Sequence, residues 1–152
     1  MNKNFFEIEN VNFSTGGKNK VKNLSLKIEN EGDVICLLGP SGIGKTTILR
    51  TIAGLEKISS GKISLKNKII SSSKIHVEPE NRNISLSFQD NCLFPHYNVL
   101  DNIKFGAARN QKSKKKLDVD EIINFLHLNH IKDKFPHQIS AGESQRAALA
   151  RS

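Results

Sequence analysis

One stretch of the chain decides the fold class: Val34-Ile35-Cys36-Leu37-Leu38-Gly39-Pro40-Ser41-Gly42-Ile43-Gly44-Lys45-Thr46-Thr47. It opens with five apolar residues, a pattern typical of a central strand buried on both faces of a parallel sheet. The segment 39–46 then fits the spacing G-x-x-x-x-G-K-[ST] of phosphate-binding loops. A helical apolar pattern follows from Ile48 to Ala53, and Gly54 can end that helix. The stretch therefore predicts a strand, a glycine loop and a helix.

Each part of the loop has a physical role. Glycine accepts backbone angles that other residues avoid and lets the chain pass close to an anion. Successive N–H groups, with the N-terminus of the following helix, then point at phosphate. Lys45 is predicted to reach the β- and γ-phosphates of a nucleotide, and the Thr46 hydroxyl to coordinate Mg²⁺. A chance glycine turn is the alternative, which the flanking strand and helix patterns disfavour. The predicted nucleotide-binding residues of the loop are Gly39, Pro40, Ser41, Gly42, Ile43, Gly44, Lys45, Thr46 and Thr47.

Outward from the loop, the sequence predicts more strands and then helices. Residues 5–13 and 21–28 alternate between apolar and polar, with a Gly16-Gly17 turn between them, which favours an antiparallel pair of strands. Two further strands are expected at 61–65 and 84–88, with a loop at 71–73 between them. Three helices are expected at 99–105, 118–128 and 142–151. Together these elements indicate an α/β fold.

Composition and charge are ordinary for a globular protein. The longest purely apolar run, Val34–Leu38, is far shorter than the ~20 residues of a membrane-spanning helix, and the N-terminus does not resemble a secretory signal. We therefore expect a cytoplasmic protein. The net charge of +8 includes a lysine cluster at 112–116, which lacks aromatic residues to stack bases and is interpreted as a solvated loop. Cys36 and Cys92 lack metal-site spacing, and Cys36 is expected to be a small core residue.

The loop alone leaves kinases, GTPases, helicases and transporter ATPases open, but two further segments narrow the choice. Residues 39–55 resemble the Walker A region of ABC-transporter ATP-binding subunits. Residues 82–96 look like the Q-loop region of that family, and residues 139–151 are similar to its signature and signature helix. The three segments occur in the family's order and span almost the whole chain. The chain is thus identified by resemblance as an ABC-type ATP-binding subunit.

This resemblance implies a fold and a domain organisation. It implies a P-loop NTPase core with an antiparallel β-layer and an inserted helical subdomain, incomplete at the C-terminus. On this basis we expect the β-layer and P-loop core at 1–90, the helical subdomain at 91–141 and the signature helix at 142–152. The family continues beyond that helix into an acidic strand that carries the aspartate for Mg²⁺ and the glutamate that activates water, and neither lies within the sequence. We therefore expect the isolated chain not to hydrolyse ATP.

The resemblance also implies roles, cofactors and partners. Gln89 would sense the γ-phosphate and bind Mg²⁺ together with Thr46, although it could equally be a polar residue at a strand end. The implied cofactors are ATP and Mg²⁺. Phe94, Pro95 and His96 resemble the surface that docks a permease, or they could be packing at the edge of a core. The implied signature residues, which would contact the ATP of a second subunit in a head-to-tail dimer, are Ser140, Ala141, Gly142 and Glu143.

Two departures from the family pattern stand out. The usual leucine-serine-glycine-glycine-glutamine reads Ile139-Ser140-Ala141-Gly142-Glu143 here, which adds a Cβ at Ala141 and a carboxylate at Glu143. The family stacks adenine on an aromatic residue upstream of the loop, where this chain has Thr15. Phe13 shares a strand face with Thr15 and could substitute for that aromatic residue.

Three hypotheses for function follow from this sequence. The first is an ATP-binding subunit of an importer, which would lie peripherally on the inner face of the plasma membrane. Its partners would be a second ATP-binding subunit, transmembrane permease subunits and, indirectly, an external binding protein. The second is a nucleotide-binding module without hydrolysis of its own, and the third is a basic nucleic-acid binder, which we disfavour. Residues 76–82 and 93–96 look most like ferric-iron importers, with thiamine, polyamine, sulfate and molybdate importers as close relatives.

Overall fold

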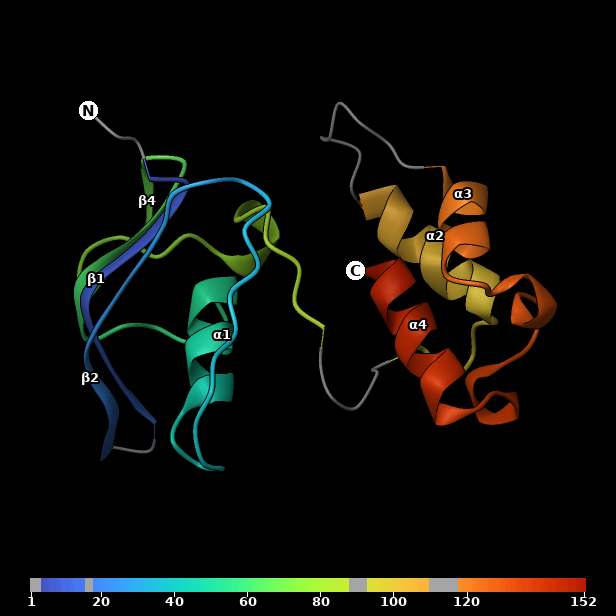
Figure 1. Cartoon of the computed structure of the whole chain (residues 1–152), viewed down its shortest axis with the longest axis horizontal. Coiled ribbons are helices and arrows are strands. Elements are labelled where there is room, and N and C mark those ends of the chain that lie inside the picture. Colours follow the sequence, from blue (N-terminus) through green and yellow to red (C-terminus); the bar gives the residue numbers. More distant parts are fainter. Residues whose placement is uncertain (1–3, 16–17, 88–92, 110–117) are drawn as a thin grey trace. The chain divides into compact units, whose positions relative to one another are not determined.

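The chain contains two compact units, the N-terminal unit (Met1–Leu86) and the C-terminal unit (Ser87–Ser152) (Figure 1). Each unit has its own apolar core. The structure, a computed structural model, describes residues 4–15, 18–87, 93–109 and 118–152.

A four-stranded antiparallel sheet, in the order β2-β1-β3-β4, forms one layer of the N-terminal unit. Its strands are β1 (Phe6–Thr15), β2 (Lys18–Ile28), β3 (Ser60–Leu65) and β4 (Lys68–Ser72). Ile8 of β1 lies opposite Leu26 and Ile63 on the two neighbouring strands. A register shift between Ile8 and Val11 leaves both side chains buried, although their odd spacing would otherwise place them on opposite faces.

One helix of this unit, α1 (Lys45–Ala53), packs on the buried face of the sheet (Figure 1). Ile48 and Ile52 of the helix contact the core that the strands supply. Gly54 ends the helix in the left-handed conformation (φ 91°), and its N–H donates to the carbonyls of Arg50 and Thr51. The predicted helix, its glycine end and the predicted antiparallel strand pair are therefore confirmed, as is the α/β class.

Four predictions for this unit are wrong. Residues 34–38 and 84–87 are not strands, because none of the strands in the described residues pairs with them. Val34 and Leu38 are instead 89% and 91% exposed, and Cys36 is exposed rather than in the core. The predicted loop at 71–73 begins inside β4, because Ser71 and Ser72 pair with β3. The Ser71 hydroxyl is also buried and accepts a hydrogen bond from Arg82.

The described part of the C-terminal unit contains three α-helices: α2 (Val99–Arg109), α3 (Val119–Phe125) and α4 (Ala141–Arg151). Single 3-10 turns lie at Asn129–Ile131 and Pro136–Gln138, and another, in the N-terminal unit, lies at Pro79–Asn81. All three helices were expected, but α3 is shorter than predicted, because the chain turns out of the helix at Leu126 and His127 takes a positive φ of 54°. The core of the unit is formed by Val99, Ile103, Ile123, Leu128, Ile131 and Ala147.

Two contacts fix the layout of the C-terminal unit. At Gly106, α2 approaches the backbone carbonyl of Arg151 in α4 so closely that a Cβ would collide with it. Asn102 of α2 is fully buried; its amide oxygen accepts the N–H of Phe94 and its amide nitrogen donates to the carbonyls of Phe94 and Tyr97. No helix in the described ranges has the length and apolar character needed to cross a membrane.

Candidate functional site

The glycine loop between residue 38 and α1 owes its path to left-handed backbone positions. Gly42 has a φ of 82°, and Gly44, which caps α1, has a φ of 107°. A Cβ at Gly44 would lie 2.9 Å from the side chain of Val21 on β2, so the strand packs directly against the loop. Glycine is thus required at position 44 both by conformation and by space.

The side chain of Lys45 folds back over this loop. Its Nζ donates to the carbonyl oxygens of Gly39 at 2.6 Å and Pro40 at 2.8 Å. These bonds hold an ammonium group at the N-terminus of α1, where the helix dipole is positive and no acidic residue lies in the first turn. The combination of a cation, a helix N-terminus and the open Gly42 suits a polyanion.

The side chains that follow Lys45 place hydroxyl groups at the start of α1. Thr46 is exposed in the first turn, where its hydroxyl is an oxygen ligand of the type that Mg²⁺ prefers. Among the described residues, no group of three or more His, Cys, Asp or Glu side chains forms a metal site.

Arg82 anchors the opposite end of α1. It is 1% exposed and donates to the carbonyl oxygens of Thr51 and Ile52, both at 3.0 Å, and of Val77 at 2.6 Å. Burial lowers the pKa of the Arg82 guanidinium. A Cβ at Gly54 would collide with this guanidinium. The hydrogen bonds of Arg82 fix the C-terminal end of α1, the helix whose N-terminus carries the loop. The sequence analysis missed this role, because the partners of Arg82 are backbone groups distant in sequence.

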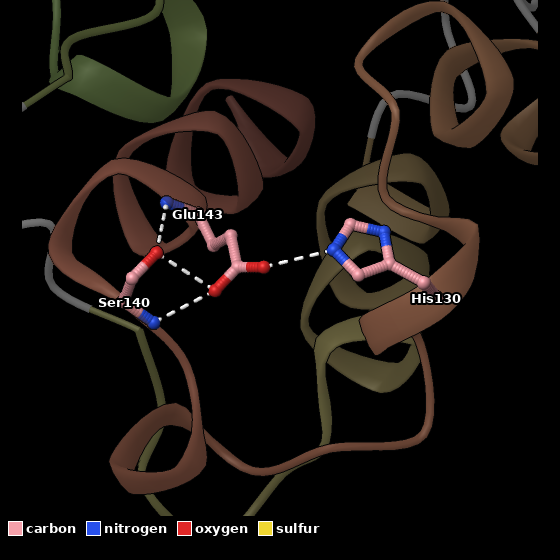
Figure 2. Close-up of polar contacts among 3 residues, drawn as sticks. All are labelled: His130, Ser140 and Glu143. Carbon is pink, nitrogen blue, oxygen red and sulfur yellow. Dashed lines mark hydrogen bonds and ion pairs between the residues drawn. The ribbon is translucent and has the colours of Figure 1, made fainter.

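The predicted signature residues lie in the C-terminal unit, at the N-terminus of α4. Ser140 caps the helix: its hydroxyl accepts from the Glu143 N–H at 3.4 Å, while its own N–H and hydroxyl donate to Glu143 Oε2 at 2.8 and 2.7 Å (Figure 2). The other carboxylate oxygen, Oε1, lies 2.9 Å from Nε2 of His130. Hydrogen bonds from Ser140, and then from His130, lower the pKa of Glu143 to about 2.

His130 lies in a turn thirteen positions from Glu143, so no local sequence pattern marks it as a partner of the signature segment. Ala141 and Gly142, which lie between Ser140 and Glu143 in the sequence, are exposed. A Cβ at Gly142 would meet only Nη1 of Arg146, at 3.8 Å. The backbone at Gly142 is therefore open to a ligand.

The remaining predicted residues have mixed outcomes. Phe13 is 2% exposed in the core of the N-terminal unit, so its ring has no free face for adenine, and this burial does not favour the stacking prediction. Gln89 lies outside the described residues. Phe94 is partly buried and makes ring contacts with Tyr97 and Phe105, while Pro95 and His96 are exposed. The docking surface and the core edge both stay predictions for that segment.

Comparisons with known proteins agree on one family. A family model described as "ABC transporter" matches residues 21–152. The Fe(3+) ions import ATP-binding protein of Fusobacterium nucleatum is 39% identical over 147 residues, covering 95% of this chain and 38% of that protein. The sulfate/thiosulfate import ATP-binding protein of Neisseria meningitidis is 38% identical over 150 residues, covering 95% and 41%. The spermidine/putrescine import ATP-binding protein of Nitrosospira multiformis is 41% identical over 147 residues, covering 95% and 39%.

Solved structures show the same relationship. The cbiO1 protein of Clostridium perfringens, described as part of the ABC transporter complex cbiONQ, matches with a TM-score of 0.77 and 31% identity, covering 98% of this chain and 61% of that one. An ATP-binding subunit of an ABC transporter, at 18% identity, matches in fold with a TM-score of 0.81 over 97% of this chain and 61% of its own. The chain spans about two fifths of the length of the curated relatives it matches.

Proposed function

The chain belongs to the ABC transporter family of ATP-binding proteins, and from that premise we propose that it binds Mg·ATP at the loop 39–46 as part of an importer's ATP-binding subunit. The observation that carries this proposal is the position of Lys45. Its ammonium group is held at 2.6 and 2.8 Å by two carbonyl oxygens of the loop itself, directly at the N-terminus of α1. Phosphate oxygens entering the loop would take over these bonds and neutralise the charge.

The groups around Lys45 suit a Mg-bound triphosphate. The backbone N–H groups of the loop and of the first turn of α1 would bind the phosphate oxygens. Thr46 would offer its hydroxyl to Mg²⁺, and Gln89 is proposed as a second protein ligand. When bound, the ion would neutralise part of the negative charge of the phosphates. Arg82 and Gly54 keep α1 in place while the loop binds, because they fix its C-terminal end.

Titration with Mg·ATP tests this proposal. Lys45→Ala should weaken binding at least about tenfold, because a hydrogen bond to a charged group contributes about 1.5–3 kcal/mol. Lys57→Ala is the matched control, since Lys57 is an exposed lysine in the same unit, beyond the end of α1. Equal affinities for the wild type and Lys45→Ala, measured by isothermal titration on folded protein, would refute the proposal.

We further propose that transport requires a second ATP-binding subunit and membrane permease subunits. The names of the relatives as import proteins, and the description of the cbiO1 protein as part of a transporter complex, support this arrangement. The N-terminus of α4 would then face the ATP of the second subunit, because an exposed serine cap and helix dipole suit phosphate.

Ferric iron is the cargo that we propose to test first. Relatives from Fusobacterium nucleatum and Mannheimia succiniciproducens are named for Fe(3+) import, while others at similar identity are named for sulfate or polyamines. Uptake of labelled ferric iron, sulfate and spermidine, measured in cells with and without this chain, distinguishes the three. Loss of sulfate or spermidine uptake with iron uptake intact would exclude iron.

A further inference from the structure

The carboxylate of Glu143 occupies the donors at the start of α4. Figure 2 shows it between Ser140 and His130, with one oxygen directed at each residue. Oε2 accepts both the N–H and the hydroxyl of Ser140, and Oε1 lies 2.9 Å from the His130 ring nitrogen. A carboxylate is acceptor-only, so the Ser140 hydroxyl hydrogen is committed to it.

We propose that Glu143 is an internal competitor for the phosphate that this segment would bind, and that His130 is the positioning residue that holds the competitor in place. The inference rests on the proposed function, because it concerns the ATP of a second subunit. It changes the role of Glu143 on α4 from a contact with ATP to a competitor, and it adds His130 on the 3-10 turn at Asn129–Ile131. The pairing of these two residues sets how readily Ser140 becomes available.

The chemistry of competition is direct. A phosphate at this helix N-terminus needs the same N–H and hydroxyl donors of Ser140 that the carboxylate now uses. The carboxylate is bound tightly as an anion, as its pKa of about 2 reflects, and its charge also repels an approaching phosphate. Phosphate can therefore bind Ser140 only when Glu143 moves aside.

The surroundings leave room for that exchange. The backbone at Gly142 is open, and the nearest atom to a Cβ there is Nη1 of Arg146 at 3.8 Å, so a cation lies beside the space that phosphate would enter. Against this, His130 fixes the carboxylate from the side opposite Ser140. Without His130 the carboxylate loses one of its partners and is held less firmly over the serine.

Removing the charge of Glu143 should preserve the helix cap. Glutamine at the third helical position forms the same reciprocal capping box as glutamate. Glu143→Gln thus keeps the shape of the cap but replaces the anionic competitor with a neutral amide, which holds the Ser140 donors more weakly and does not repel phosphate. His130→Ala leaves the carboxylate but removes its second anchor, and His137→Ala is the matched control, since His137 is an exposed histidine nearby that is stacked on Phe135.

The experiment is an amide NMR titration of the whole ¹⁵N-labelled chain with Mg·ATP, in which two regions are followed separately. The amides of Gly42 and Gly44 report the proposed function, and those of Ser140 and Gly142 report the inference. For Glu143→Gln we expect the midpoint at Ser140 and Gly142 to fall about tenfold, as loss of a hydrogen-bonded charged competitor implies. His130→Ala should lower it less, and His137→Ala should leave it unchanged.

The double variant separates positioning from a structural role. If His130 acts only through the Glu143 carboxylate, then His130→Ala adds nothing in the Glu143→Gln background. An equal response of Ser140 and Gly142 in the wild type and Glu143→Gln, with the amides of Gly42 and Gly44 still shifting, overturns the inference alone. If Gly42 and Gly44 do not shift in folded protein, the proposed function fails as well.

Discussion

At Gly44 one residue satisfies two requirements at once. Its φ of 107° is left-handed, and its α-carbon faces the side chain of Val21. Gly32 has a similar φ of 99° but no atom within 4 Å of a Cβ. Substituting alanine at each glycine therefore separates the free-energy cost of the backbone angle from the cost of steric crowding.

Substitution at these two glycines tests the loop geometry. Gly32→Ala should lower the free energy of unfolding by about 1–2 kcal/mol, the cost of a left-handed non-glycine residue. Gly44→Ala should cost more and should also weaken Mg·ATP binding, because either the loop or Val21 must shift. Denaturant unfolding and ATP titration on both variants measure this. Equal stability losses with equal ATP affinity would contradict the role assigned to Gly44.

The pKa of Glu143 predicts a specific pH dependence. It is lowered to about 2 from an ordinary value near 4.3, so the folded state binds the proton less tightly than the unfolded state. The stabilisation from the carboxylate is therefore complete above about pH 4.3 and is lost as the pH falls towards 2. Glu143→Gln should flatten the stability curve of the C-terminal unit in that window, as followed by urea unfolding from pH 6 to pH 2. A wild-type slope in the Glu143→Gln variant would show that other groups cause it.

How far the sequence predicts individual residues depends on where their partners lie. Lys45 and Ser140 could be singled out as candidate residues because the patterns that contain them span only a few neighbouring positions. Arg82 and His130 were missed, because they act on groups that only the folded chain brings together. The sequence correctly placed Phe13 on the first strand, but it could not show that the ring is buried in the core.

Among the elements, prediction succeeded where the chain is stabilised locally. The pattern of α1, its glycine end and the pattern of α4 all lie within their own segments. The segment 34–38 was misjudged because a run of apolar residues becomes a strand only when neighbouring strands bond to its backbone. The described residues contain no such neighbour for it, and Val34 and Leu38 are consequently exposed.

The crossing of α2 and α4 gives a test at the same scale. A Cβ at Gly106 would collide with the Arg151 carbonyl, whereas one at Gly142 meets only a flexible guanidinium at 3.8 Å. Gly106→Ala should therefore destabilise the C-terminal unit by about 1–3 kcal/mol through overpacking. Gly142→Ala should stabilise it by about 0.5–1 kcal/mol, because alanine favours a helix over glycine. Chemical denaturation of each variant measures the change, and a stabilising Gly106→Ala would contradict the close approach.

Across the whole molecule, the two units have separate apolar cores. Ile63, 1% exposed, belongs to the sheet core, and Ile103, fully buried, belongs to the helical core. Replacing either by alanine should cost about 2–5 kcal/mol, but in different places. Hydrogen exchange should show loss of protection in β1–β4 for Ile63→Ala and in α2 and α4 for Ile103→Ala. Uniform loss across both units in both variants would indicate a single cooperative core instead.

The central claim is that residues 39–46 bind the phosphate chain of a nucleotide rather than its base. The most direct measurement compares the affinities of Mg·ATP, Mg·ADP, AMP and adenosine for the folded chain. If Lys45 and the loop amides bind the phosphates, ATP and ADP should bind at least about tenfold more tightly than AMP, and adenosine should bind most weakly. Equal affinity for ATP and adenosine, or no affinity for any of them, would contradict this account.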